Sequence, residues 1–131
     1  MGQPILVVTQ SRGLRLLRNA RELISSGWCQ GADARDREGN TVEPWSERAV
    51  EWSLLGAIVR VLELEAEEYG EVPLDELASA LYALADLIEV DSLADWNDAA
   101  QRTQAEVIET IRAAEAVFEP PWPEEARPDP N

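Results

Sequence analysis

Residues 46–70, SERAVEWSLLGAIVRVLELEAEEYG, contain the most hydrophobic periodic segment of the chain, and they decide the fold class. Apolar side chains recur at helical spacing along this stretch, and the apolar arc is wide. Ser46 is typical of an N-cap, and Gly70 is typical of a helix end. Gly56, inside the helical pattern, indicates a close crossing by another helix. We therefore predict a central helix over residues 46–68.

Three further segments have the periodicity of amphipathic helices. Leucines follow one face of residues 11–26 and of residues 73–89. Residues 101–118 begin with Thr103 and Glu106, which have the spacing of a capping box. These three segments and the central one predict four main helices.

The connection between the first two helices and the end of the chain differ from the rest. Residues 32–43 hold turn residues between short polar flanks, which is typical of a small hairpin or an ordered loop. Residues 119–131 are rich in proline and acids, so we expect an extended or disordered tail. Trp122 in this tail either docks on the body or binds a partner. The predicted fold is all-α, with one helical domain over residues 1–118.

Charge and composition exclude several classes of function. The chain has a formal net charge of −15, which disfavours binding to nucleic acid or to an anionic membrane. Residues 1–48 contain seven arginines and six acids, whereas residues 49–131 contain four arginines and twenty acids. Because the chain has no histidine and one cysteine, we expect no metal site, and we predict no cofactor. A signal peptide or membrane span is not recognisable, so we expect a cytoplasmic protein.

The acidic run ELEAEEYGE, residues 63–71, is the first candidate functional feature. Acids near the C-terminus of a helix oppose the helix dipole, so this run breaks a local rule without a visible gain. One interpretation is a solvated helix end, and the other is a surface that binds a partner protein. The carboxylates of the second interpretation belong to Glu63, Glu65, Glu67, Glu68 and Glu71.

Two tryptophan-containing loops are the second candidate. DWNDAAQRT, residues 95–103, follows a turn that Asp91 is predicted to cap, and GWCQG, residues 27–31, follows the first helix. One interpretation is structural, with caps, ion pairs and a buried indole. The other is a ligand site or active site in which an arginine contacts an anion and Asp98 is an acid or acceptor. The residues concerned are Trp28, Arg35, Trp96, Asn97, Asp98, Arg102 and Thr103.

Two other features receive a mainly structural interpretation. Arg12, Arg15, Arg18 and Arg21 step by three along the first helix, so they either pair with the protein's own acids or form a row that binds a partner. Cys29 has no histidine to activate it, and we expect a buried small side chain rather than a nucleophile.

Three stretches together, LISSGWCQGADARDREG, AVEWSLLGAI and SLADWNDAAQRTQAEVIETI, resemble a family of small uncharacterised proteins from actinobacteria and their phages. The similarity covers about residues 14–114, and its most recognisable element is Trp-Asn-Asp followed by Arg-Thr. In that family the tryptophan at Trp52 is usually followed by cysteine, whereas this chain has Ser53. The resemblance implies a shared structural element or a shared site at this motif, and it implies no activity and no catalytic residues.

These observations lead us to expect a non-enzymatic, acidic protein that binds a protein partner. One concrete form is an inhibitor from a phage or mobile element, of the anti-CRISPR or another anti-defence type, that presents carboxylates to a basic nucleic-acid-binding surface. The alternative is a small-molecule-binding protein or enzyme with a site where the loop of Trp28 meets the loop of residues 96–103. A structural or dimerising protein is a third possibility.

Overall fold

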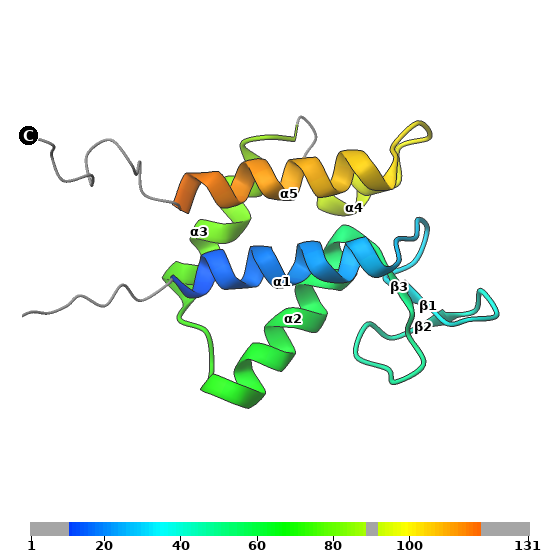
Figure 1. The fold of residues 1–131 in the computed structure, drawn as a ribbon, viewed down its shortest axis with the longest axis horizontal. Helices are drawn as coiled ribbons and strands as arrows, with labels where there is room; N and C mark the ends of the chain where they lie inside the picture. The colour runs from blue at the N-terminus through cyan, green and yellow to red at the C-terminus, as the bar shows by residue number, and fades with distance from the viewer. Residues whose placement is uncertain (1–10, 89–91, 119–131) are drawn as a thin grey trace, which may run out of the picture.

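The computed structural model describes residues 11–88 and 92–118, which are mostly helical and carry a small three-stranded sheet at one end (Figure 1). The predictions for Asp91, for Trp122 and for the tail lie outside the described residues. In chain order the elements are α1 Arg12–Ser26, β1 Ala34–Arg35, β2 Thr41–Val42, β3 Glu51–Trp52, α2 Leu54–Tyr69, α3 Leu74–Ala85, α4 Leu93–Asn97 and α5 Gln104–Phe118.

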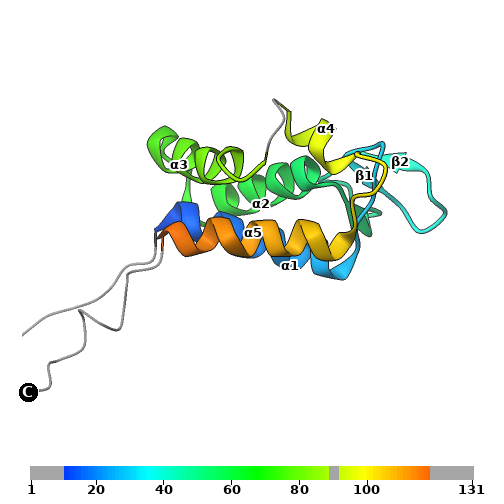
Figure 2. The ribbon, with the colours of Figure 1, turned by 90° about the horizontal axis from the view of Figure 1, so that it is seen from above.

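Helix α1 lies at the centre of the fold, where it packs against α5, α2, α3 and β3. Figure 2 shows α1 and α5 side by side, with α2 and α3 in a second layer. Leu17 and Ile24 of α1 are fully buried, and Arg21 forms an ion pair with the buried Glu115 of α5. The prediction that residues 46–68 form the central helix is therefore wrong. Long arginine side chains let α1 accept neighbours on several sides, because Arg12, Arg15 and Arg21 are only partly exposed and each forms an ion pair with a buried carboxylate.

Helix α2 begins at Leu54, eight residues after the predicted start. Its N-cap is Ser53, whose hydroxyl accepts a hydrogen bond from the Gly56 N–H at 3.0 Å, and not Ser46. The residues before it form β3, which pairs with β1 in an antiparallel sheet of order β2-β1-β3. The hairpin of β1 and β2 is confirmed, but the third strand was not predicted, because its hydrogen bonds come from a segment distant in sequence.

Two glycines allow the loop after α1 to lie against α2 and the segment before it. A Cβ atom on Gly56 would lie 1.9 Å from the carbonyl oxygen of Asp33, and one on Gly27 would lie 2.2 Å from that of Val50. The close approach predicted at Gly56 is therefore present, but the neighbour is loop backbone and not a helix. These contacts hold the loop of residues 28–33 at the start of α2.

Side-chain oxygen atoms cap the starts of α1, α2, α4 and α5, whereas α3 follows Pro73 without a side-chain cap. Ser11 caps α1, and Glu76 of α3 accepts a hydrogen bond from the Arg12 N–H at 2.9 Å, which ties these two helices together. Helix α3 ends at Ala85, before the end of the predicted range of residues 73–89.

The connection from α3 to α5 contains a short helix, α4, where the sequence predicts only a turn. Its N-cap is Ser92, which accepts a hydrogen bond from the Asp95 N–H at 3.1 Å. The capping box of α5 is confirmed: Thr103 Oγ1 accepts from the Glu106 N–H at 3.1 Å, and Glu106 Oε1 accepts from the Thr103 N–H at 3.0 Å. Helix α5 thus begins at Gln104.

Candidate functional site

Asn97, at the end of α4, is the centre of a buried hydrogen-bond cluster and is 0% exposed. Its Oδ1 accepts from Trp28 Nε1 at 2.7 Å and from the Leu54 N–H at 3.0 Å. Its Nδ2 donates to the Cys29 carbonyl at 3.1 Å and to Asp98 Oδ1 at 3.0 Å. The amide therefore uses two acceptor positions and two donors, which is its full capacity. Nothing on this side chain is left for a ligand.

A second set of hydrogen bonds joins the loop after α1 to the connection between α4 and α5. Gln30 Nε2 donates to the carbonyl oxygens of Asn97 and Ala99, at 2.9 Å each. Asp98 Oδ1 also accepts from the Gly31 N–H at 3.0 Å. The proposed acid or acceptor, Asp98, thus already accepts two hydrogen bonds within the protein. We name Trp28, Gln30, Asn97 and Asp98 the Asn97 hub.

Arg102 of the Trp-Asn-Asp and Arg-Thr motif links the end of α4 to the start of α5. It donates from Nε to the Trp96 carbonyl at 2.9 Å, and its guanidinium carbon lies 4.0 Å from the centre of the Trp96 ring. Its Nη1 lies 3.6 Å from Glu106 Oε1. A shallow hollow of about 380 Å³ lies beside Trp96 and Arg102. A small-molecule site near these loops stays a prediction. The internal hydrogen bonds of the motif do not favour it, because they occupy polar groups that would otherwise bind a ligand.

Arg35 and Cys29, the other reactive-looking side chains near the hub, are also engaged. Arg35 donates to the carbonyl oxygens of Gln30 at 3.0 Å and Gly39 at 3.1 Å, so it braces the hairpin. Cys29 is buried, and desolvation raises the pKa of its thiol to about 11. The thiol is therefore protonated at neutral pH, which is unlike a nucleophilic cysteine.

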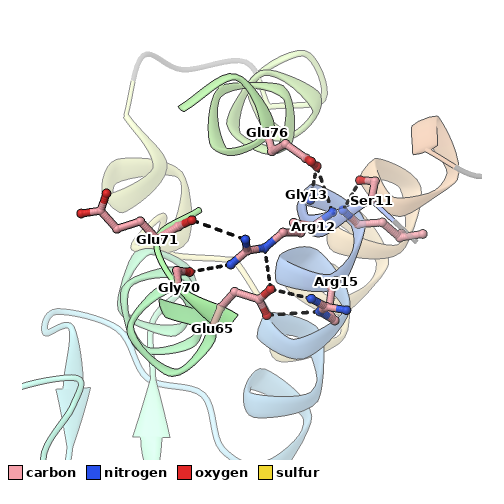
Figure 3. Close-up of polar contacts among 9 residues, drawn as sticks. Ser11, Arg12, Gly13, Arg15, Glu65, Gly70, Glu71 and Glu76 are labelled. Atoms are coloured by element: carbon pink, nitrogen blue, oxygen red, sulfur yellow. Dashed lines mark hydrogen bonds and ion pairs between the residues drawn. The ribbon is translucent and has the colours of Figure 1, made fainter. Parts of the chain in front are cut away.

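Glu65 faces Arg12 and Arg15 of α1 (Figure 3). It is only 4% exposed, and its Oε2 lies 2.9 Å from Arg12 Nε and 2.7 Å from Arg15 Nη2. The hydrogen bonds from Arg15, followed by those from Arg12, lower the pKa of this carboxyl despite its burial. Arg12 also donates to the Gly70 carbonyl at 2.6 Å, at the end of α2. This cation offsets the unfavourable placement of acids at the helix C-terminus.

The five carboxylates of the acidic run therefore do not form one surface. Glu65 is buried against α1, which removes it from the surface predicted to bind a partner. Glu68 is exposed, but its charge acts on Arg15. Glu63 and Glu71 line a groove between α2 and α3, and Glu67 is exposed one helical turn after Glu63. Figure 3 shows the Glu71 carboxylate directed away from the arginines.

The groove that Glu63 and Glu71 line has a volume of about 720 Å³, and most of its lining is apolar. Leu74, at the start of α3, is 80% exposed, and Trp45, in the loop before β3, is 49% exposed. We name this surface the α2–α3 groove. It is lined by Trp45, Val59, Leu62, Glu63, Ala66, Glu71, Val72, Pro73, Leu74 and Leu77.

Comparison with known proteins places the chain in a family. Residues 9–117 match the family of unknown function DUF6197. The chain belongs to this family. No curated protein and no solved structure matches it. The family covers both the Asn97 hub and the α2–α3 groove, and its description assigns no activity to either.

Across residues 11–88 and 92–118, no three or more acids and cysteines gather in a way that could hold a metal ion. None of the helices in that same part of the chain has the length and apolar character needed to cross a membrane.

The α2–α3 groove was missed in the sequence because its residue types carry no motif. Trp45 and Leu74 were not among the predicted site residues. The available signal was the wide apolar arc of α2: Val59, Leu62 and Ala66 extend it beyond the face that packs on α1. An arc wider than the contact with the core leaves an apolar strip for something else.

Proposed function

We propose that this protein is a non-catalytic binding module whose α2–α3 groove and adjoining carboxylates bind a basic surface of a partner protein. The observation that carries this proposal is the exposed apolar groove of about 720 Å³ with Glu63 and Glu71 in its wall. Exposed apolar patches with charged edges are typical of protein–protein contact sites.

A binding role is also supported by what the polar clusters do. Catalysis needs a group that is free to exchange protons or attack a substrate. The side-chain amide of Asn97 is fully used in internal hydrogen bonds, and the pKa of Cys29 is raised to about 11. Asn97 and Cys29, whose side chains suggested a reactive site, therefore have structural roles.

The charge distribution supports a particular class of partner. Residues 49–131 carry twenty of the 26 acids and four of the 11 arginines. A surface of this sign attracts proteins that bind nucleic acid, since their binding faces are basic. We therefore propose an inhibitor of a nucleic-acid-binding protein, with an anti-CRISPR or other anti-defence protein as one form.

The test compares two variants with the same change in net charge. The groove variant is Glu63→Lys, Glu67→Lys and Glu71→Lys. The control is Glu22→Lys, Glu47→Lys and Glu109→Lys, three exposed acids outside the groove lining. Both variants are used with the wild type for affinity capture from the native host. Each captured protein is purified, and its nucleic-acid binding is measured with and without the wild-type chain.

We expect the wild type and the control to retain a protein that the groove variant loses, and we expect nucleic acid to compete with the chain for it. Equal capture by all three would contradict the groove as the binding surface. A captured protein that binds nucleic acid equally well in the presence of the chain would contradict the inhibitor.

A further inference from the structure

We propose that the α2–α3 groove receives one amphipathic, basic helix of the partner. Its apolar face would contact Trp45 and Leu74, and its lysines or arginines would contact Glu63 and Glu71. This inference rests on the proposed function and adds the conformation and chemistry of the bound segment.

The walls of the groove determine which conformation fits. Val59 to Ala66 of α2 form one wall, about two helical turns or 10 Å long, and the start of α3 with the segment before it forms the other. The α2 wall is helical, so its backbone groups are bonded within the helix, whereas the other wall combines the non-helical residues 71–73 with the first turn of α3. A strand laid along the α2 wall would lose water from its own N–H and C=O groups without gaining partners there. A helix satisfies these groups internally, so a helix is the segment that this apolar groove accepts.

The lining of the groove determines the chemistry of that helix. Leu74 is 80% exposed and Trp45 is 49% exposed, so both have large apolar areas to bury in a complex. Tryptophan is also enriched among the residues that dominate binding energy. The charged residues of the lining are both glutamates, Glu63 and Glu71, so complementarity requires a basic helix.

A second copy of this chain does not fit the same requirement. Its net charge is −15, so two copies repel each other. The first helix holds a row of arginines, but Arg12 and Arg15 are paired with Glu65, and Arg21 is paired with Glu115. A second copy is therefore not the occupant that we propose.

The experiment titrates the full chain into a fluorescein-labelled peptide and follows the anisotropy. The peptide has about 15 residues of leucine and lysine, with leucines at i, i+3, i+4 and i+7, a length at which helices begin to persist. A second peptide has the same composition in an order without an apolar face. Both peptides carry the same charge, so general attraction to an acidic protein affects them equally. A difference between their affinities therefore reports binding of the apolar face in the groove.

Two matched pairs of variants accompany the titration. Leu74→Ser removes an apolar contact, and its control Tyr82→Ser alters a residue of the same helix that is 70% exposed and outside the groove lining. The triple lysine variant at Glu63, Glu67 and Glu71 is compared with its charge-matched control. Circular dichroism shows whether each variant is folded.

We expect the amphipathic peptide to bind about tenfold more tightly than the reordered one. We expect Leu74→Ser to weaken it about tenfold, to the level of the reordered peptide, with Tyr82→Ser unchanged.

Equal binding of both peptides, with weakening only in the groove lysine variant, would overturn the helix and leave the acidic binding surface in place. If both lysine variants weakened peptide binding equally, or if neither peptide bound, the inference would be overturned. The proposed function is tested separately, and it would be contradicted if the wild type and both lysine variants captured the same proteins from the host. A wild-type dimer in sedimentation that Leu74→Ser dissociates would overturn the inference in favour of a second copy.

Discussion

The Asn97 hub and the α2–α3 groove differ in how fully their residues are used by the fold. The hub is built from two amides, an acid and an indole, yet the side chain of Asn97 has all of its hydrogen bonds within the protein. The groove is built mainly from aliphatic residues and glutamates, yet Leu74 is 80% exposed. Polar residue types that suggest chemistry therefore hold the structure together, and plain residue types form the open surface.

This difference follows from the cost of buried polar groups. A buried amide must be hydrogen-bonded, so the contact of the loop after α1 with α2 and α4 needs a residue such as Asn97 to satisfy the polar groups that meet there. An exposed leucine has no such requirement, and its free energy is lowered only when another surface covers it. The two regions should therefore respond in opposite ways to substitution.

The largest effect on stability is expected for Asn97→Ala. The substitution leaves the Trp28 indole N–H and the Leu54 N–H without their partner in the core, so we expect a loss of about 3–5 kcal/mol in the free energy of unfolding, measured by urea denaturation. Asp98→Asn is the control, because it keeps an oxygen for its two bonds and should cost below about 1 kcal/mol. If Asn97→Ala lost as little unfolding free energy as the control, the structural role of Asn97 in the hub would be contradicted.

A smaller loss is expected for Glu65→Gln. The substitution leaves Arg12 and Arg15 without their counter-charge, and since both arginines are partly exposed we expect about 1–3 kcal/mol. The exposed Glu67→Gln should change stability by less than about 0.5 kcal/mol. If urea denaturation gave the two variants the same stability, Glu65 would belong with the surface acids after all.

The ion pairs of Glu65 also predict a pH dependence of stability. The arginines lower the pKa of Glu65 below its ordinary value of 4.5, so the carboxylate stabilises the folded state fully at pH values above 4.5. That contribution is lost as the pH falls through the lowered pKa. The difference in unfolding free energy between wild type and Glu65→Gln should therefore be constant from neutral pH to about 5 and shrink below it. A difference that grew on acidification would contradict the assigned direction.

Cys29 tests whether any part of the hub region is reactive. Burial raises the pKa of the thiol to about 11, so little thiolate is present at pH 8. We expect a disulfide reagent to label the folded protein far more slowly than the urea-unfolded protein, with a rate that still rises above pH 9. Labelling of the folded chain as fast as the unfolded chain would show an activated thiol and revive an enzymatic role.

The smallest effect on stability is expected for Leu74→Ser. Because this side chain is 80% exposed, its loss should change the free energy of unfolding by less than about 0.5 kcal/mol. A thermal melt beside Tyr82→Ser checks this. A loss above about 2 kcal/mol would mean that the groove is part of the core and not an open surface.

Local patterns predicted the features that depend on neighbouring residues. The periodicity of α1 and α5, the capping box of Thr103 and Glu106, and the β1–β2 hairpin all arise from short-range rules. Strand β3 was missed because its partner in β1 lies about 17 residues earlier in the chain, and a local pattern contains no information on such pairing.

The site was predictable only in part for the same reason. The sequence singled out Trp28 and Asn97, which do lie together. It did not show that the Leu54 N–H, which is distant in sequence, donates to Asn97 Oδ1. This hydrogen bond occupies the last free acceptor position of the side-chain amide. The sequence also grouped Glu65 with the surface acids of the run, although Glu65 stands in the helical register of Leu54 and Val61, which are buried with it.

The most direct test of the difference between hub and groove is a chemical-shift map of the ¹⁵N-labelled chain titrated with the amphipathic leucine–lysine peptide. We expect shifts at Glu63, Ala66, Val72 and Leu74, and unchanged signals from the Trp28 indole N–H and the Asn97 side-chain amide. Shifts centred on Trp28 and Asn97, with the groove signals unchanged, would contradict this difference between the hub and the groove.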